Sequence, residues 1–204
     1  MNSLTLIRDS RPGPLDVAIS HAILSAVSEG EMGATLRLHY PGPMVAFGRA
    51  DRVTEGYGAA VRASRAHGFE AVERLAGGRA AVFHESTIAF SLATPEREPK
   101  TGIDARFEMI SQLMVDAFEA LGIDARIGEI PGEYCPGKWS VNVAGLIKVM
   151  GVGQRLVRRA VHIGGVVVVD EGDRIRDVLI PVYRALGLDW DPRTAGALAD
   201  RSPG

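Results

Sequence analysis

The amino-acid sequence predicts an α/β fold of the mixed α+β kind, with a central mixed, largely antiparallel sheet and flanking helices. Segments with the hydrophobic period of helices are interspersed with short alternating or wholly apolar segments typical of strands. Several of these strands are joined by links of hairpin length, too short for the crossovers that parallel strands need. The 204 residues suffice for a single domain, 1–204, and we expect a mobile tail after about residue 190.

The first half of the chain predicts two helices and five strands. Residues 14–30 carry apolar side chains at three- and four-residue steps, with Pro14 suited to the first turn and Gly30 to the end. A second helix is expected over residues 55–67, ending at Gly68. Strand patterns occupy residues 36–40, 44–48, 70–75, 80–83 and 87–93.

The second half predicts a long amphipathic helix, a hairpin, a central strand and a last helix. Residues 104–121 form one apolar stripe, with Asp104 as a plausible N-cap and Gly122 as the stop. Strands are expected at 141–143 and 146–150, joined by a turn at residues 144–145. An apolar central strand follows at 160–170. The last expected element is a helix at 175–186, which Pro181 bends or restarts.

The composition is that of a soluble globular protein, with 46% hydrophobic and 24% charged residues. The formal net charge of −2 gives no basic field that would attract nucleic acid. The first nine residues lack the apolar run of a signal peptide, and no segment approaches the ~20 apolar residues of a membrane span. We therefore expect a cytoplasmic protein with no nucleic-acid or membrane partner.

A glycine pair between two predicted strands is the first candidate for chemistry. Gly77 and Gly78 would let backbone amides approach a ligand closely, and Arg74 and Arg79 could pair with an anion. A plain hairpin turn with solvated arginines explains the same residues. His84, which follows, is by itself more typical of a structural strand residue than of a catalyst.

The second candidate is Cys135, the only cysteine in the chain. A single cysteine excludes an intrachain disulfide and a multi-cysteine zinc site, and we expect no metal site. Glycines and a proline surround Cys135, so its thiol can be exposed and rigidly held. A nearby cation would make the thiolate a strong nucleophile, whereas an inert lone cysteine is the simpler interpretation.

The third candidate is Lys148, which lies within an apolar strand. Lysines are rarely buried without a partner, so Lys148 should meet an anion or a developing negative charge, unless it sits on an edge strand facing water. Gly151 and Gly153 remove side chains from alternate positions on one strand face. This leaves room for something lying across the strand, although close sheet packing would also explain them.

Together these segments resemble the biotin/lipoate protein ligase superfamily over residues 15–170. The residues that carry the resemblance are an opening helix at 15–24, Gly48-Arg49 at a strand end, the glycine-rich segment 74–84, the lysine segment 148–155, and the His162–Gly164 strand. The resemblance, to the lipoate-protein ligase A and octanoyltransferase type, implies a class II synthetase-like catalytic domain with helices on one main face of a mixed sheet.

This superfamily contains two chemistries. ATP-dependent ligases form an acyl-adenylate, whereas amidotransferases and octanoyl transferases use no ATP and pass the acyl group through a cysteine thioester. Tyr134-Cys135-Pro136-Gly137 closely resembles the cysteine loop of amidotransferases that take octanoyl groups from the glycine cleavage H protein. The resemblance implies Cys135 and Lys148 as catalytic residues. It implies substrate binding by Arg74, Gly77, Gly78, Arg79, His84, Gly151, Gly153, His162 and Gly164.

Some residues depart from the ligase pattern. Arg79 replaces a third consecutive glycine, and an Asn-Asp pair that helps to hold metal and nucleotide is missing before Lys148, where Asn142 stands without an Asp. The chain also has no room for the extra C-terminal domain of standalone ligases. His84, by contrast, departs from the amidotransferase pattern, because the amidotransferases usually lack a histidine at this position.

The sequence therefore predicts a protein-lysine acyltransferase of lipoate metabolism that moves an octanoyl or lipoyl group through a Cys135 thioester and requires no cofactor. Its partners would be lipoyl-carrier proteins, namely the glycine cleavage H protein and dehydrogenase E2 lipoyl domains. The first alternative is an ATP-dependent lipoate–protein ligase that uses ATP and Mg²⁺. The second is a non-catalytic acyl- or carrier-binding homologue.

The thioester mechanism carries a geometric expectation. Lys148 should assist proton transfer, with its nitrogen within about 8 Å of the Cys135 sulfur. A two-residue turn at 144–145 would place Val143 opposite Leu146 and Val141 opposite Lys148. The cysteine loop must then fold back over the sheet at Pro136-Gly137.

Overall fold

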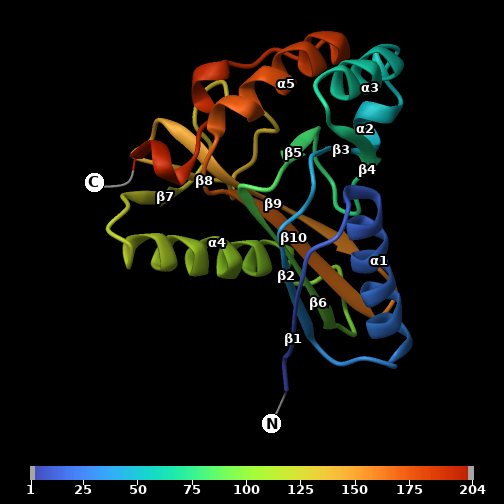
Figure 1. Cartoon of the computed structure of the whole chain (residues 1–204). Coiled ribbons are helices and arrows are strands. Elements are labelled where there is room, and N and C mark those ends of the chain that lie inside the picture. Colours follow the sequence, from blue (N-terminus) through green and yellow to red (C-terminus); the bar gives the residue numbers. More distant parts are fainter. Residues whose placement is uncertain (1–2, 202–204) are drawn as a thin grey trace.

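The computed structural model describes residues 3–201 and contains two β-sheets. The large sheet has the strand order β1-β2-β6-β10-β9-β8-β7, and the small sheet has the order β4-β3-β5 (Figure 1). The strands are β1 (Thr5–Asp9), β2 (Thr35–His39), β3 (Met44–Phe47), β4 (Glu70–Glu73), β5 (Ala81–Phe83), β6 (Thr87–Pro95), β7 (Ala125–Ile127), β8 (Val141–Val143), β9 (Ile147–Leu156) and β10 (Ala160–Val168).

The sequence predicts one central mixed, largely antiparallel sheet, which the large sheet confirms, whereas the small mixed sheet was not predicted. In the large sheet β1 pairs with β2 in parallel and every other pair is antiparallel, while in the small sheet β3 is parallel to β4 and antiparallel to β5. The helices are α1 (Gly13–Glu29), α2 (Arg49–Arg52), α3 (Tyr57–Ala66), α4 (Ile103–Glu119) and α5 (Gly172–Leu186).

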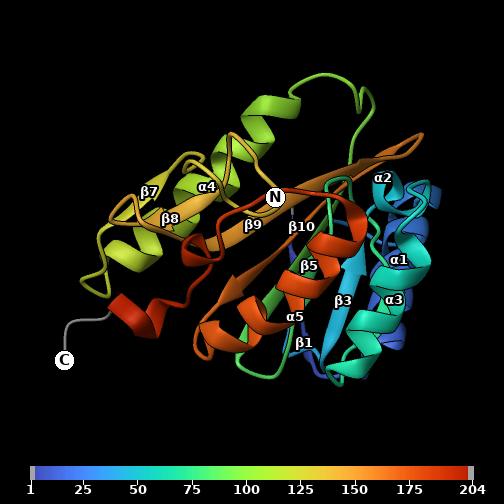
Figure 2. The same cartoon turned by 90° about the horizontal axis from the view of Figure 1, so that it is seen from above.

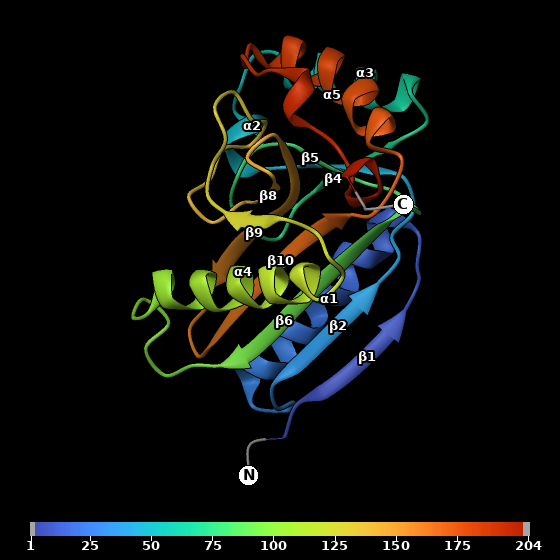
Figure 3. The same ribbon diagram turned by 90° about the vertical axis from the view of Figure 1, so that its left-hand side faces the viewer.

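Helices cover both faces of the large sheet, so the expectation of one main helical face is wrong. Figure 3 shows α4 in front of this sheet and α1 behind it. The reason lies in β6, where neighbouring side chains point to opposite faces. Ala93 packs with Leu24 of α1, whereas Phe90 packs with Ile110 and Phe118 of α4. Because β6 is apolar on both faces, each face needs a cover.

The small sheet supports a separate layer. Helices α3 and α5 lie side by side against it (Figures 1 and 2). Val45 and Phe47 of β3 join Val178 and Val182 of α5 in one buried cluster. Pro181 does not interrupt α5, which runs unbroken from Gly172 to Leu186.

Helix α4 begins differently from the prediction. Its N-cap is Gly102 in the left-handed conformation, with φ of 71°, and Asp104 lies in the first turn without capping it. Asp104 still suits this place, since a carboxylate in the first turn favours the helix dipole. The sequence analysis did not predict the short helix α2 or strands β1 and β7, which form the two edges of the large sheet.

The segment after Trp190, predicted as a mobile tail, packs on the domain up to Arg201. It forms two short 3₁₀ helices, Pro192–Thr194 and Leu198–Arg201. Ala195 and Ala197 are completely buried, and Ala195 bridges to Lys148 of β9. Small side chains that look dispensable in the sequence are therefore the ones that fit closely against β9.

The β8–β9 hairpin has a different register from the predicted one. Val143 lies opposite Ile147 and Asn142 opposite Lys148, with a bulge between Val141 and Asn142. The turn is one residue longer than expected, because Leu146 belongs to it and donates its N–H to the Val143 carbonyl at 3.0 Å. Strand β9 then runs on through Leu156, which places Lys148 and the two glycines that follow it on a single strand.

Candidate active site

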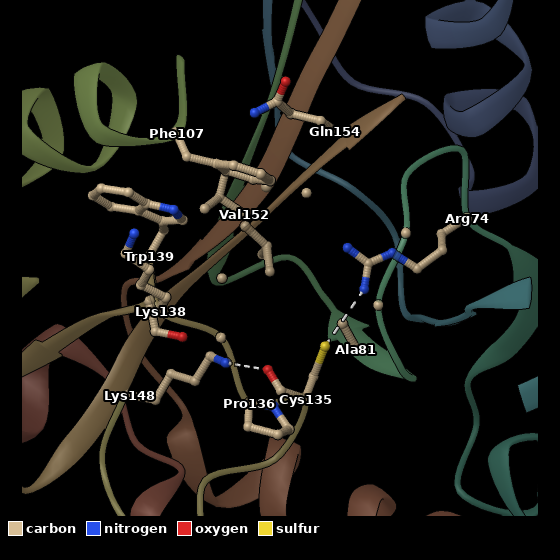
Figure 4. A pocket seen from close by; sticks show the side chains of 18 of the residues that line it. Arg74, Ala81, Phe107, Cys135, Pro136, Lys138, Trp139, Lys148, Val152 and Gln154 are labelled. Carbon is tan, nitrogen blue, oxygen red and sulfur yellow. Dashed lines mark hydrogen bonds between the residues drawn. The ribbon is translucent and has the colours of Figure 1, made fainter. Parts of the chain in front are cut away.

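Three of the predicted segments meet around one cavity of about 480 Å³ (Figure 4). These are the glycine loop after β4, the loop that carries Cys135, and strand β9. The cavity lining includes Arg74, Gly77, Gly78, Ala81, Phe83, Phe107, Tyr134, Cys135, Trp139, Lys148, Gly151, Val152, Gly153, Gly165 and Val166. The structure therefore brings three segments that the sequence analysis singled out separately to one cavity.

Cys135 presents its sulfur to the glycine loop. The Arg79 backbone N–H donates to Sγ at 3.1 Å, and Arg74 Nη1 lies 3.9 Å from it. The residue adopts a left-handed φ of 43°, an uncommon conformation for a side chain with a Cβ. A backbone N–H and a guanidinium therefore both approach the sulfur.

Gly78 must be glycine for this contact to exist. Its φ is 106°, which other residues rarely adopt, and a Cβ there would lie 3.0 Å from Cys135 Sγ and 2.9 Å from Arg74 Nη1. The same loop touches the end of β3, since a Cβ on Gly48 would overlap the Gly78 carbonyl oxygen. Gly48 and Gly78, which lie far apart in the sequence, thus allow the loop to pack against the sulfur.

The Arg79 side chain does not face the cavity, contrary to its predicted role in substrate binding. Its Nη1 lies 3.3 Å from Oδ1 of the fully buried Asp51, and Asp51 Oδ2 accepts the Gly48 N–H at 2.9 Å. A buried carboxylate needs such partners, which explains why the guanidinium turns inward. Arg79 therefore serves the site through its backbone N–H.

Lys148 is 2% exposed, and its amine lies on the opposite side of the Cys135 backbone from the sulfur (Figure 4). Its Nζ donates to Glu133 Oε1 at 2.8 Å, to the Tyr134 carbonyl at 3.0 Å and to the Cys135 carbonyl at 2.7 Å. An ammonium has three N–H donors, so all three are used. Figure 4 shows the amine and the sulfur on different sides of the loop.

The amine and the sulfur still belong to one site. The Cys135 carbonyl is 2.7 Å from Nζ, and covalent geometry places the sulfur within roughly 5 Å of that carbonyl oxygen. The predicted separation of at most about 8 Å is therefore confirmed. A direct sulfur–lysine pair, however, is not what the structure contains, because Lys148 is already committed to Glu133.

Glu133 is the functional residue that the sequence analysis missed. It is 3% exposed and lies two residues before Cys135. The signal was available, since a lysine in an apolar strand predicts an anionic partner and Glu133 is the acidic residue of the cysteine loop.

The two glycines of β9 admit different neighbours. A Cβ on Gly153 would lie 3.0 Å from Ala76 Cβ and 3.1 Å from the Gly77 carbonyl, so the glycine loop itself occupies that place. A Cβ on Gly151 would lie 3.5 Å from Lys148 Cε, an ordinary contact. The room predicted across β9 is therefore shared between the loop and the cavity.

His162 and Gly164 line a second, smaller cavity of about 70 Å³ beneath α1, which shares Arg74, Phe83 and Gly165 with the first. His162 Nε2 lies 2.9 Å from Ser91 Oγ, and its Nδ1 has no hydrogen-bond partner among residues 3–201. Burial, and secondarily the Arg74 charge, lowers the pKa of His162 from 6.5 to about 4. The imidazole is therefore neutral near pH 7.

His84 lies outside both cavities, so the structure gives no support to its predicted role in substrate binding. Phe83 lines the cavity, and successive side chains of a strand point to opposite faces, so His84 points away from it. It is fully buried, accepts the Ser86 N–H at 3.2 Å, and is not among the described residues that line either cavity. Burial, and secondarily the Arg174 charge, lowers its pKa.

Residues 14–184 match the family model described as "Lipoyl protein ligase A/B catalytic domain". The chain belongs to this family. A relative from Geobacillus kaustophilus, named octanoyl-[GcvH]:protein N-octanoyltransferase, is 30% identical over 187 residues, or 89% of this chain and 66% of the relative. A relative of the same name from an Exiguobacterium species is 32% identical over 136 residues, or 67% of this chain and 48% of the relative.

The lipoyl protein ligase A/B fold is also found by comparison with solved structures. The Thermoplasma acidophilum protein described as a bi-partite lipoate protein ligase has a TM-score of 0.69 at 18% identity, covering 100% of this chain and 78% of its own. A lipoate-protein ligase A bound with ATP has a TM-score of 0.65 at 18% identity, covering 92% and 87%. This likeness concerns the fold. The chain spans two thirds or less of the curated relatives described above.

Within residues 3–201, no helix is both long and apolar enough to span a bilayer. Nor do those residues bring three or more His, Cys, Asp or Glu side chains together in a way that could hold a metal ion.

Proposed function

We propose that this chain is a protein-lysine acyltransferase of lipoate metabolism, which moves an octanoyl or lipoyl group to a carrier lysine through a Cys135 thioester. The observation that carries the proposal is the sulfur at the cavity wall, held on the Arg79 N–H at 3.1 Å. The names of the curated relatives, octanoyl-[GcvH]:protein N-octanoyltransferase, support an octanoyl group and a glycine cleavage H protein donor. A solved neighbour described with its E2 lipoyl domain supports lipoyl carriers as acceptors.

The reaction requires two exchanges at one acyl carbon. The Cys135 thiolate attacks the carbonyl carbon of the acyl-lysine amide, a C–S bond forms, and the C–N bond breaks as the leaving amine takes up a proton. The Lys148 ammonium is the proton-bearing side chain beside this site. A deprotonated lysine of the acceptor carrier then attacks the thioester: a C–N bond forms, the C–S bond breaks and the Cys135 thiolate leaves. The proton lost by the attacking nitrogen returns to the Lys148 amine, which gave its proton to the first leaving amine.

Backbone N–H groups of the glycine loop supply the electrostatic part of the mechanism. Gly78 and Arg79 lie directly against the sulfur, so an oxyanion formed on the attacked carbon would meet the N–H groups of these two residues, whereas the Gly77 N–H donates to the Gln154 carbonyl. One donor of this kind lowers the barrier by about 3 kcal/mol. Arg74, beside the sulfur, would add its positive charge.

The two neighbouring cavities would hold the acyl chain. They share the lining residues Arg74, Phe83 and Gly165, so a chain attached at Cys135 would extend toward His162 and Gly164 under α1. Burial of an eight-carbon chain contributes on the order of 6 kcal/mol at about 0.8 kcal/mol per methylene. Gly151, which lines the main cavity, leaves that part of its wall free of a side chain.

An ATP-dependent lipoate–protein ligase, with ATP and Mg²⁺, is the second candidate. Two cationic side chains, Arg74 and Lys148, line the same cavity and could meet the phosphate and acyl oxygens of an acyl-adenylate. A structural neighbour was solved with ATP bound. Lys148, however, is committed to Glu133 and two carbonyls, whereas the Cys135 sulfur already faces the glycine loop, so the thioester route requires less rearrangement.

Intact-mass analysis after incubation with an octanoylated carrier tests the proposal. The expected result is a mass increase of one octanoyl group on the wild-type chain and no increase on Cys135→Ser. A parallel mixture with lipoate, apo-carrier, ATP and magnesium identifies the ligase by its ATP consumption. If Cys135→Ser still transfers the acyl group at the wild-type rate, the thioester mechanism is wrong. A homologue without catalytic activity would retain the acylated carrier without turnover.

A further inference from the structure

Glu133 is a buried carboxylate that collects four donors around the cysteine loop. Its Oε2 accepts the Ile130 N–H at 3.1 Å, and its Oε1 accepts the Gly137 N–H at 3.2 Å, the Ser140 hydroxyl at 2.6 Å and the Lys148 ammonium at 2.8 Å. Buried charges persist in proteins when they are paired and hydrogen-bonded in this way. This side chain therefore has a complete set of partners.

These donors lie on both sides of Cys135 in the sequence. Ile130 precedes the cysteine, Gly137 and Ser140 follow it, and Lys148 comes from β9. One carboxylate thus ties both flanks of the loop to the large sheet. The loop needs such a tie, because Cys135 has a φ of 43° that a free loop would relax.

Glu133 also decides where the Lys148 ammonium sits. With the carboxylate present, Nζ lies beneath the loop on the carbonyls of Tyr134 and Cys135, and the sulfur is left to Arg74 and the Arg79 N–H. Without it, a buried ammonium would keep two neutral acceptors and would be drawn to other negative groups in the cavity. The ion pair therefore keeps the amine and the nucleophile in separate, fixed places.

We infer that Glu133 is a positioning residue for acyl transfer, which acts by holding Lys148 under the Cys135 loop. The inference rests on the proposed function, since the step that it serves is acyl-enzyme formation. It adds a third member to the pair Cys135 and Lys148. Glu133 does not touch the reacting atoms, so its effect on the rate must pass through Lys148.

A double-mutant cycle on single-turnover acylation tests this. The donor is octanoylated glycine cleavage H protein, and the acyl-enzyme is followed by intact mass at several donor concentrations. We expect Glu133→Gln to slow acylation at least tenfold while the half-saturating donor concentration stays within threefold. In the Lys148→Met background, adding Glu133→Gln should change the rate less than threefold. Glu129→Gln is the matched control, because Glu129 is exposed on the same segment.

The outcomes separate the hypotheses. The inference is overturned if Glu133→Gln acylates at a rate within threefold of the wild-type rate. It is also overturned if adding Glu133→Gln to Lys148→Met slows acylation a further tenfold. If Glu133→Gln alone does not fold, the double variant, which removes both buried charges, carries the test against Lys148→Met. If the wild-type chain forms no acyl-enzyme, the proposed function itself fails, and the inference fails with it.

Discussion

At the residue scale, few positions of the site can accept a larger side chain or a different charge. Cys135 adopts a left-handed backbone, and Gly78 makes room for its sulfur. Lys148 has its three donors satisfied within one buried cluster. In the proposed thioester mechanism, the reactivity of Cys135 would therefore depend on these neighbours as well as on the cysteine itself.

Gly78→Ala tests the fit between the glycine loop and the sulfur. A methyl group there would meet Cys135 Sγ and Arg74 Nη1 at about 3 Å and would be strained at a φ of 106°. We expect a loss of about 1–3 kcal/mol in the free energy of unfolding and at least a tenfold slower acylation. Denaturant unfolding and intact mass measure the two effects. Gly33→Ala is the control, since a Cβ there meets nothing within 4 Å; equal behaviour of the two variants would refute the fit.

His162 makes stability depend on pH. Its folded pKa of about 4 lies below the ordinary 6.5, so between these values the unfolded chain binds a proton that the folded chain does not. Stability from this group is complete above pH 6.5 and is lost as the pH falls toward 4, by about 2 kcal/mol between pH 7.5 and 5. Urea unfolding of His162→Gln should lack that part of the decline. His21→Gln, at an exposed position, should keep it.

At the element scale, the short helix α2 holds the glycine loop in place. Asp51 in α2 accepts the Gly48 N–H at the end of β3 and pairs with Arg79 of the loop. This links the strand end, the helix and the loop whose N–H contacts the sulfur. The position of the Arg79 N–H thus depends on a helix of four residues, which is too short to show a helical period in the sequence.

Asp51→Asn tests this link. The variant keeps the shape but loses the charge that attracts Arg79, so we expect a loss of about 1–2 kcal/mol in the free energy of unfolding and a several-fold slower alkylation of Cys135 by iodoacetamide. Cys135 is the only cysteine, so the alkylation reports one site. Asp124→Asn, which removes an exposed pair with Arg126, should change neither measurement. An unchanged alkylation rate in Asp51→Asn would contradict the proposed link.

At the scale of the whole molecule, α1 closes the back of the large sheet over a buried ionic cluster. Arg37 of β2 is completely buried and pairs with Asp16 of α1 and with Asp9 of β1, while His39 lies 2.8 Å from Asp16. The second cavity lies directly beside Asp16 and His39. The same cluster therefore anchors α1 and shapes the space under it.

Arg37→Leu should destabilise the whole domain. It leaves the carboxylate of Asp16 buried without its guanidinium, and the loss of one partner of a buried pair costs about 3–5 kcal/mol. Chemical denaturation measures the change, and the exposed Arg126→Leu should cause little change. A small effect of Arg37→Leu would mean that water or a proton replaces the guanidinium.

Local patterns were sufficient for most of the fold and for the three segments that form the site, although not for Glu133. The helices at α1, α3, α4 and α5 follow from apolar periodicity and from glycines at their ends, because burial of one face requires that spacing. The central strand β10 follows from its nearly continuous apolar run. The segments that line the main cavity also follow, since glycines and charged residues within apolar strands indicate a ligand.

Only the tertiary structure decided which way each side chain points and which partner it takes. Strand alternation turns His84 away from the site, and the longer turn at Leu146 sets Asn142 rather than Val141 opposite Lys148. The pairing of Lys148 with Glu133, and of Arg79 with Asp51, depends on segments distant in the sequence. Residue types determine which chemistry is available. Packing in three dimensions determines which charges become neighbours, because the cost of removing a charge from water depends on its tertiary surroundings and not on a local sequence pattern.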